Sequence, residues 1–181
     1  MARAAFQLNA EVVDKAALRY LDRFDSTVAN LKRVMLRQLG KQIARELPLD
    51  EQAAAGDALR QLVESLLERY QRSSLLDDVR YATNRADALR RRGTSTRAIR
   101  QKLQLKGVPE AAVDRVLERP SDSEGDPDLA SARSYAKRRR LGAYRRASEA
   151  EYTPERRRKD LAALARAGFS YSIASAALVA D

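Results

Sequence analysis

The chain of 181 residues contains no cysteine and no histidine. Without them the chain has no disulfides, no thiolate nucleophile, no imidazole acid–base chemistry and none of the usual zinc ligands. No apolar run approaches the roughly 20 residues of a membrane span, and the first residues lack the apolar core of a secretory signal. We therefore expect a cytoplasmic protein that is not an enzyme and has no metal, cofactor or membrane contact.

Glycine, proline and aromatic residues are also scarce, with 7 Gly, 5 Pro and 6% aromatic residues. Hydrophobic residues still make up 44% of the chain, which is enough for a folded, helix-rich protein. Its cores would be thin layers of Leu, Val, Ile and Ala. Because burial stabilises by roughly 25 cal/mol per Å² of apolar surface, each such small unit would be marginally stable alone.

The net charge of +10 is unevenly distributed along the chain. Residues 11–77 hold 11 basic and 11 acidic side chains and are neutral. Residues 78–118 hold 10 basic against 5 acidic side chains, and residues 127–181 hold 12 against 6, which gives +5 and +6. Clustered positive charge indicates a partner with a negative field, either nucleic acid or an acidic protein groove.

Two segments repeat one pattern, in which a Leu stands four residues before a Gly and an apolar residue follows that Gly. They are Leu103 to Val108, around Gly107, and Leu164 to Phe169, around Gly168. Glycine tolerates the positive φ that ends a helix, and the next residue can fold back onto the last turn. Pro109 suits a first helical position and Ser170 an N-cap, so each segment predicts helix, Gly turn, helix.

Apolar periodicity extends this pattern to the whole chain and predicts an all-α protein, an elongated array of three tandem three-helix repeats. Residues 11–74, 75–118 and 129–181 are the three expected repeats. Residues 1–10 are expected to be a flexible N-terminus, and residues 119–128 an acidic linker containing Pro and Gly.

Arginine and lysine clusters are the candidate binding residues. One interpretation is that these cations only interact favourably with the negative end of the helix dipole, at the C-terminal end of a helix. It explains the cluster Arg90 to Arg92, but it explains less well the second cluster, Arg138 to Arg140, at the equivalent helix end of another repeat. We therefore predict a partner-binding surface made of Arg90, Arg91, Arg92, Arg97, Arg100, Lys102, Lys106, Arg138, Arg139 and Arg140.

Two other features have plainer explanations. Asp77 and Asp78 are adjacent, so on a helix they would not face one another, and an Asp before a helical run is a common N-cap. We expect capping rather than metal or acid–base chemistry. Tyr81 and Tyr135 fall at matching places in two repeats, which favours core packing over base stacking.

The second repeat contains Leu76-Asp77-Asp78-Val79-Arg80-Tyr81-Ala82, then Arg92-Gly93, Ile99-Arg100 and Lys106-Gly107-Val108. With these motifs it resembles the central repeat of the RecX regulators of the RecA recombinase. Tyr81 stands where Phe is commoner in the family. The stretch from Leu164 to Ser170 is similar to the C-terminal repeat of the family. Residues before 70 match through helix pattern and position.

The resemblance implies a three-helix-repeat monomer that lies in the groove of the RecA–DNA filament. There it would inhibit strand exchange and ATP hydrolysis and favour disassembly of the filament. The residues themselves indicate only a basic, modular, helical binder, which leaves a non-sequence-specific nucleic-acid-binding protein as the alternative. Direct contact with single- or double-stranded DNA remains open in both cases.

Overall fold

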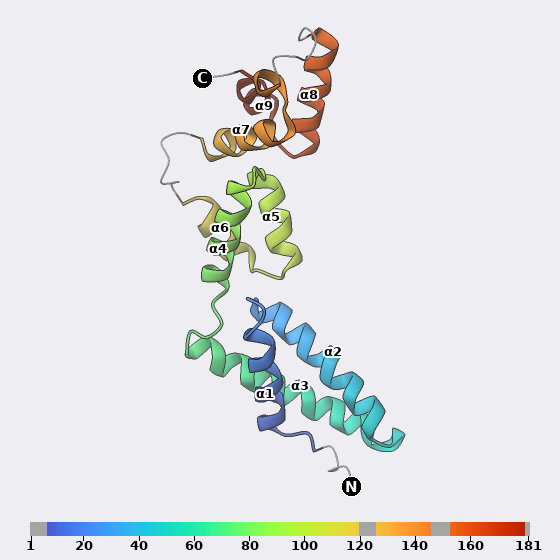
Figure 1. Ribbon diagram of the computed structural model, residues 1–181. Coiled ribbons are helices and arrows are strands. Elements are labelled where there is room, and N and C mark those ends of the chain that lie inside the picture. The colour runs from blue at the N-terminus through green and yellow to red at the C-terminus, as the bar shows by residue number, and fades with distance from the viewer. Residues whose placement is uncertain (1–6, 120–125, 146–152, 180–181) are drawn as a thin grey trace. The chain divides into compact units, whose positions relative to one another are not determined.

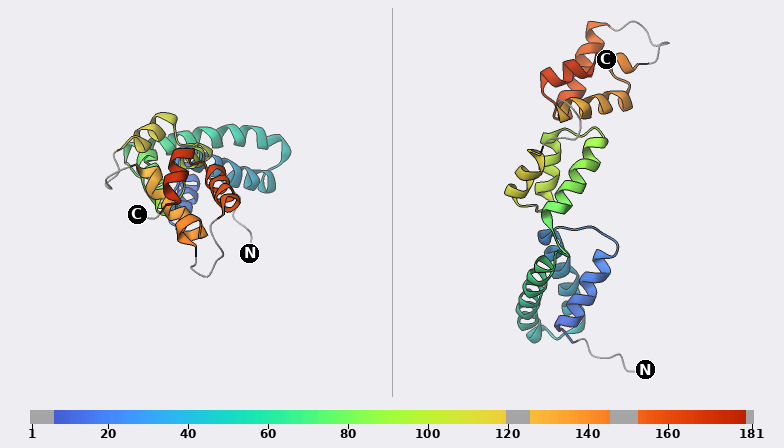
Figure 2. Two further views of the ribbon diagram at one scale, coloured as in Figure 1. Left: turned by 90° about the horizontal axis from the view of Figure 1, so that it is seen from above. Right: turned by 90° about the vertical axis from the view of Figure 1, so that its left-hand side faces the viewer.

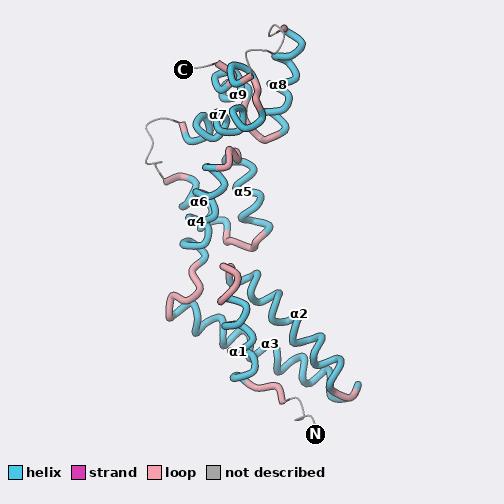
Figure 3. Tube along the Cα trace, in the orientation of Figure 1, coloured by secondary structure: helices cyan, strands magenta, loops and turns pink. Residues whose placement is uncertain are grey.

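The computed structural model describes residues 7–119, 126–145 and 153–179. All regular elements in these residues are helical, with no strand among them (Figure 3), so the predicted all-α class is confirmed. None of the helices in these ranges has the length and apolar character needed to cross a membrane. Residues 1–6 and 120–125, which hold most of the predicted flexible N-terminus and linker, lie outside the described residues.

The helices of the described residues follow one another in three sets of three, as predicted (Figure 1). The first set is α1 (Ala10–Leu21), α2 (Val28–Glu46) and α3 (Leu49–Arg72). The second is α4 (Asp78–Arg91), α5 (Thr96–Leu105) and α6 (Glu110–Leu117). The third is α7 (Pro127–Arg139), α8 (Pro154–Arg166) and α9 (Tyr171–Ala177), with a short 3-10 helix, η1 (Gly142–Tyr144), after α7.

Contacts along the chain define two compact units. The first contains residues 1–81 together with 106–108, and the second contains residues 82–105 together with 109–181. The second set of helices therefore contributes to both units. The boundaries of the three repeats remain a prediction, although α7 begins two residues before the predicted third repeat, with Asp126 as its N-cap.

The core of the first unit lies between α1, α2 and α3 and consists mostly of large aliphatic side chains. Leu31 and Met35 of α2 and Val63 of α3 are fully buried, as the apolar periodicity predicts. Helix α1 ends at Leu21 with Asp22 as its C-cap, and Phe24 beyond it is 55% exposed.

The third set of helices, in the second unit, is built around smaller residues. In the ribbon views α7, α8 and α9 pack together (Figure 2). Their core contains Ala132, Leu164, Phe169, Ala174, Ala177 and Leu178. Because alanine buries little apolar surface, this core contributes less stability than the leucine-rich core of the first unit.

Both predicted Gly turns are present. Gly107 has φ 78° and Gly168 has φ 93°, and the apolar residues that follow them, Val108 and Phe169, are each 4% exposed. Ser170 caps α9 by accepting a hydrogen bond from the Ile173 amide at 3.3 Å. Pro109 precedes the first helical residue of α6 rather than occupying it, one position from the prediction.

Two hydrogen bonds fix the start of α2 within the first unit. The hydroxyl of Thr27, the N-cap of α2, donates to the Lys106 carbonyl at 2.5 Å. The Val28 amide donates to the Asp78 carboxylate at 2.9 Å. Burial raises the pKa of Asp78, and the hydrogen bond from Val28 only partly offsets that effect.

The same pair of bonds recurs at the start of α5, in the second unit. The Ser95 hydroxyl donates to the Ala167 carbonyl at 2.7 Å, and the Thr96 amide donates to Asp128 at 2.7 Å. In both cases the carbonyl belongs to the residue before a Gly turn, and the carboxylate belongs to the first turn of a repeat's first helix. The beginning of one helix is therefore fixed to the Gly turn and first helix of the following repeat.

This recurring contact corrects the predicted match between two tyrosines. Asp78 and Asp128 are equivalent, so Tyr81 corresponds to Ser131, and both of these side chains are buried. Tyr135 takes the place of the exposed Arg85. The prediction that Tyr81 and Tyr135 match was therefore wrong.

Replacing Gly107 with valine is expected to lower the free energy of unfolding by about 2 kcal/mol, because a β-branched residue is strained at positive φ. An added Cβ would also lie 2.6 Å from the Cβ of Ala29. Urea unfolding measures the loss. Gly40→Ala is the control, because Gly40 lies inside α2 with no atom within 4 Å of the added Cβ. That change should stabilise by about 0.5–1 kcal/mol, and equal effects of the two substitutions would contradict the Gly turn.

Candidate partner-binding surface

Most of the predicted partner-binding side chains are exposed to solvent. They are Arg91, Arg92, Arg97, Lys102, Lys106, Arg138, Arg139 and Arg140. The other two are partly buried and engaged within their own repeat. Arg90 donates to the Leu117 carbonyl at 3.4 Å, and Arg100 pairs with Asp114. Arg90 and Arg100 therefore stabilise the packing of α4 and α5 against α6.

The structure brings the two arginine clusters together in the second unit. The Arg138 guanidinium of α7 donates a hydrogen bond to the Arg92 carbonyl, just after α4. Gly93 lies so close to α7 that an added Cβ would be 2.6 Å from the Tyr135 amide nitrogen. Arg140 ends α7 with φ 55°, the left-handed conformation that Gly93 has after α4. The two clusters therefore belong to one basic surface. The sequence pattern does not show this juxtaposition.

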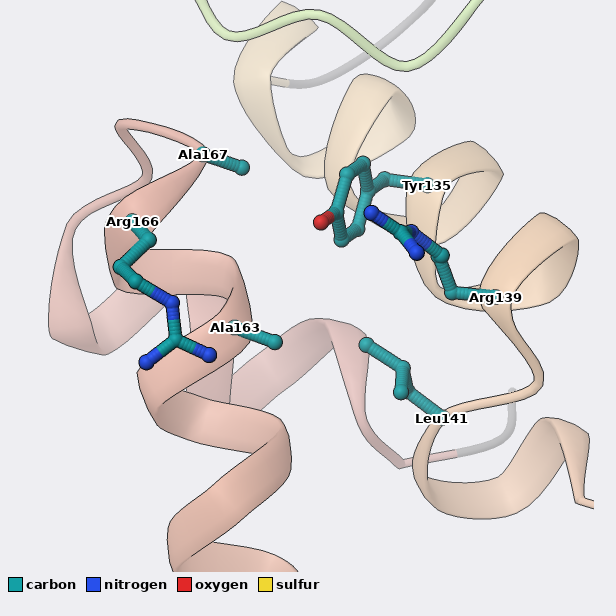
Figure 4. Close-up of a pocket in the computed structure, with 6 residues that line it drawn as sticks. All are labelled: Tyr135, Arg139, Leu141, Ala163, Arg166 and Ala167. Carbon is teal, nitrogen blue, oxygen red and sulfur yellow. The ribbon is translucent and has the colours of Figure 1, made fainter.

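A cleft of about 530 Å³ opens between α7 and α8, beside these arginines. Tyr135 and Arg139 come from α7, Leu141 follows it, and Ala163, Arg166 and Ala167 form the opposite wall (Figure 4). The walls are largely apolar, because Leu141, Ala163 and Ala167 contribute to them. No carboxylate occurs among the described residues that line the cleft.

Tyr135 forms one wall of the cleft and is held by its neighbours. The guanidinium carbons of Arg138 and Arg139 each lie 5.7 Å from the centre of the Tyr135 ring, in cation–π contact. The Phe169 ring lies edge-on with centroids 6.1 Å apart. In Figure 4 the Tyr135 hydroxyl points toward α8, across the cleft. The Tyr135 ring therefore also packs against the core of α7, α8 and α9, in agreement with the packing role predicted for it.

Arg97 extends the basic surface from α5. A Cβ added to Gly168 would lie 3.8 Å from the Cβ of Arg97, and Arg166 of the cleft stands two residues before that glycine. The bond between Ser95 and Ala167 holds this arrangement in place. Lys102 lies exposed on α5, and Lys106 belongs to the first unit.

The acidic pair of the second repeat has a structural role. Asp77 accepts hydrogen bonds from the amides of Val79 and Arg80 at 2.9 and 3.0 Å, so it caps α4. Asp78 binds the Val28 amide instead of acting as a cap. Within residues 7–119, 126–145 and 153–179, no three potential ligand side chains gather closely enough to hold a metal ion.

Comparison with known proteins gives this surface its context. A family model described as the second three-helix domain of RecX matches residues 77–117. Regulatory protein RecX of Myxococcus xanthus strain DK1622 is 40% identical over 162 residues, which is 90% of this chain and 81% of that protein. The chain belongs to the RecX family.

Two further relatives carry the same name. Regulatory protein RecX of Trichlorobacter lovleyi is 34% identical over 128 residues, 70% of each chain. That of Agrobacterium fabrum is 37% identical over 98 residues, 54% of this chain and 48% of the relative. No solved structure matches the chain. The RecX-family relatives are thus named as regulators rather than as enzymes.

The matched domain covers α4 to α6 and contains Arg91, Arg92 and Arg97 of the basic surface. The cleft between α7 and α8 lies beyond that domain, in the third set of helices. In this RecX-family protein the basic surface therefore combines residues of the matched domain with residues that follow it.

Proposed function

We propose that this RecX-family protein regulates the RecA recombinase by binding in the groove of the RecA–DNA filament. There it inhibits ATP hydrolysis and strand exchange and favours disassembly of the filament. It thereby acts in DNA repair, DNA recombination and the SOS response. It works as a cytoplasmic monomer, through binding alone, with no cofactor and no catalytic step of its own.

The observation that carries this proposal is the contact between the Arg138 guanidinium and the Arg92 carbonyl. It makes one continuous cationic surface from two repeats, with Arg91, Arg139 and Arg140 exposed around it. Such a surface suits a partner with an extended negative field, as a nucleoprotein filament has. The family membership supports RecA as that partner.

The test is the ATPase of the cognate recombinase on single-stranded DNA, with this protein titrated in. We expect inhibition well below one molecule per recombinase subunit, because one helical-repeat protein in the groove affects several subunits. An unchanged rate at equimolar protein would contradict filament regulation and favour the nucleic-acid alternative.

Direct nucleic-acid binding is the second candidate, supported by the net charge of +10. Sequence-specific recognition is disfavoured, because a recognition helix needs base-reading side chains on one face. The helix after the first Gly turn, α6, carries Glu110, Asp114 and Arg115, and the helix after the second, α9, is mostly Ala and Ser. Binding to single-stranded DNA without recombinase, measured by fluorescence anisotropy, favours this candidate only when the recombinase ATPase rate is unchanged, because a filament regulator could also contact DNA. Salt dependence alone does not separate the two candidates, since both attractions weaken with salt.

A further inference from the structure

We propose, building on the proposed function, that the cleft between α7 and α8 binds an acidic segment of the protein partner that inserts one apolar side chain. The cleft has room for such a side chain at about 530 Å³, and its walls include Leu141, Ala163 and Ala167. Arg139 and Arg166 lie on opposite walls (Figure 4). An apolar side chain matches the apolar walls, and carboxylates on both sides of it match the two arginines.

The two arginines remain able to bind carboxylates. Arg139 lies over the Tyr135 ring, and a guanidinium can stack on an aromatic face while its N–H groups stay directed outward. Arg166 is exposed at the end of α8. Arg97, beside Gly168, adds a third cation near the same end of the cleft. Acidic residues on both sides of an inserted anchor would therefore each meet a guanidinium.

A nucleic-acid strand fits the cleft less well than an acidic peptide. Sequence-tolerant binding of single strands uses an aromatic ring on which bases stack. The Tyr135 ring is only partly accessible, with the guanidinium groups of Arg138 and Arg139 over it and the Phe169 ring against it. A phosphate backbone would use the arginines but would leave the apolar hollow between Leu141 and Ala163 empty.

The binding test uses two fluorescein-labelled synthetic peptides of Asp and Glu, one with a central Phe and one with Ser in its place. Fluorescence anisotropy with the full-length chain should show the Phe peptide binding roughly ten- to a hundredfold more tightly, as expected for burial of one aromatic side chain. Equal affinities would overturn the proposal, because attraction would then be ionic alone. A mixed-sequence single-stranded DNA that binds better than the Phe peptide and competes with it would also overturn it.

Variants then locate the site. Ala163→Leu fills the cleft and should weaken binding of the Phe peptide by about tenfold, with little effect on binding of the Ser peptide. Ala165→Leu is the matched control, because Ala165 is exposed on the same helix. Arg166→Gln should weaken both peptides, whereas Arg115→Gln, at an exposed position of α6, should weaken neither. Equal affinities of the Ala163→Leu and Ala165→Leu proteins for the Phe peptide would overturn the placement of the site in this cleft.

The peptide measurement and the recombinase assay can fail separately. Peptide binding with an unchanged ATPase rate supports the cleft and contradicts filament regulation. ATPase inhibition without discrimination between the Phe and Ser peptides overturns the cleft and leaves filament regulation standing. A thermal melt accompanies each variant, and Ala163→Leu should melt no lower than the parent, because it fills a partly apolar hollow. The comparison of the two peptides on the parent protein needs no variant.

Discussion

The variant with Arg91, Arg92 and Arg97 all replaced by Glu is expected to lose inhibition of the recombinase by at least about a hundredfold. Each reversal removes a charge-assisted contact worth about 1.5–3 kcal/mol and adds repulsion. The net charge falls from +10 to +4, two charges for each residue. The measurement is the amount of protein that halves the ATPase rate on single-stranded DNA.

The fold of this triple variant should be retained. All three side chains are exposed, and the Arg92 carbonyl that accepts from Arg138 belongs to the backbone. Glutamates at the C-terminal end of α4 would be unfavourable beside the negative end of the helix dipole, whereas the glutamate that replaces Arg97 would be favourable in the first turn of α5. These effects partly cancel, so the free energy of unfolding should change by only about 1 kcal/mol.

The matched control reverses Arg33, Arg37 and Lys41, three exposed cations of α2 in the first unit. It makes the same change in net charge, so its inhibition separates local contact from overall attraction. If both variants lose inhibition equally, net charge alone drives binding. If the triple variant at Arg91, Arg92 and Arg97 inhibits like the parent, the basic surface does not bind the partner and is only exposed to solvent. The contact face would then lie on the first repeat.

The Gly turns could be predicted from sequence because their cause is local. Positive φ at Gly107 and Gly168 follows from the end of a helix, and the spacing to Val108 and Phe169 follows from the fold-back of the chain. The core residues of α2 and α3 could also be predicted, since the buried positions, such as Leu31 and Val63, recur with the helix period. These features need no knowledge of the neighbouring repeat.

The candidate site depends on tertiary contacts that periodicity does not encode. The contact between Arg138 and Arg92 joins residues 46 apart, and the bond between Ser95 and Ala167 joins residues 72 apart. The cleft exists because Ala163 and Ala167 face Tyr135, which no single helix pattern reveals. The wrong match of Tyr81 with Tyr135 has the same origin. Two aromatic residues in similar helices were aligned by type, whereas the carboxylates Asp78 and Asp128 set the register.

Asp160 is the clearest residue that the sequence pattern missed. Apolar periodicity assigns Leu161 and Leu164 to the buried face of α8, yet Asp160 is 3% exposed and Leu161 only partly buried. Asp160 stands eight residues before Gly168, as the fully buried Ile99 stands eight before Gly107. Alignment of the two Gly turns would have shown a carboxylate at a core position. That signal was present in the sequence.

Replacing Asp160 with alanine is expected to lower the free energy of unfolding of the third set of helices by about 3–5 kcal/mol. Asp160 accepts from the Arg145 guanidinium at 2.8 and 3.0 Å and from the Gly142 amide at 2.9 Å. Without it, a mostly buried guanidinium and a buried amide lose their carboxylate partner. The small alanine-rich core leaves little stability to absorb such a loss. Hydrogen exchange of the α8 and α9 amides reports it locally.

A double variant separates the buried charge from the packing. Asp160→Ile with Arg145→Leu gives α8 the aliphatic residue that α5 has at Ile99, and removing both charges together avoids an unpaired ion. The Gly142 amide would lack its Asp160 acceptor, so stability should return to within about 1–3 kcal/mol of the parent. Asp57→Ala is the control, because Asp57 pairs with Arg60 on an exposed face of α3 and should change stability by less than about 0.5 kcal/mol. If Asp160→Ala destabilises no more than Asp57→Ala, the segment after α7 is held by its contacts with Leu178, and the buried ion pair contributes nothing measurable.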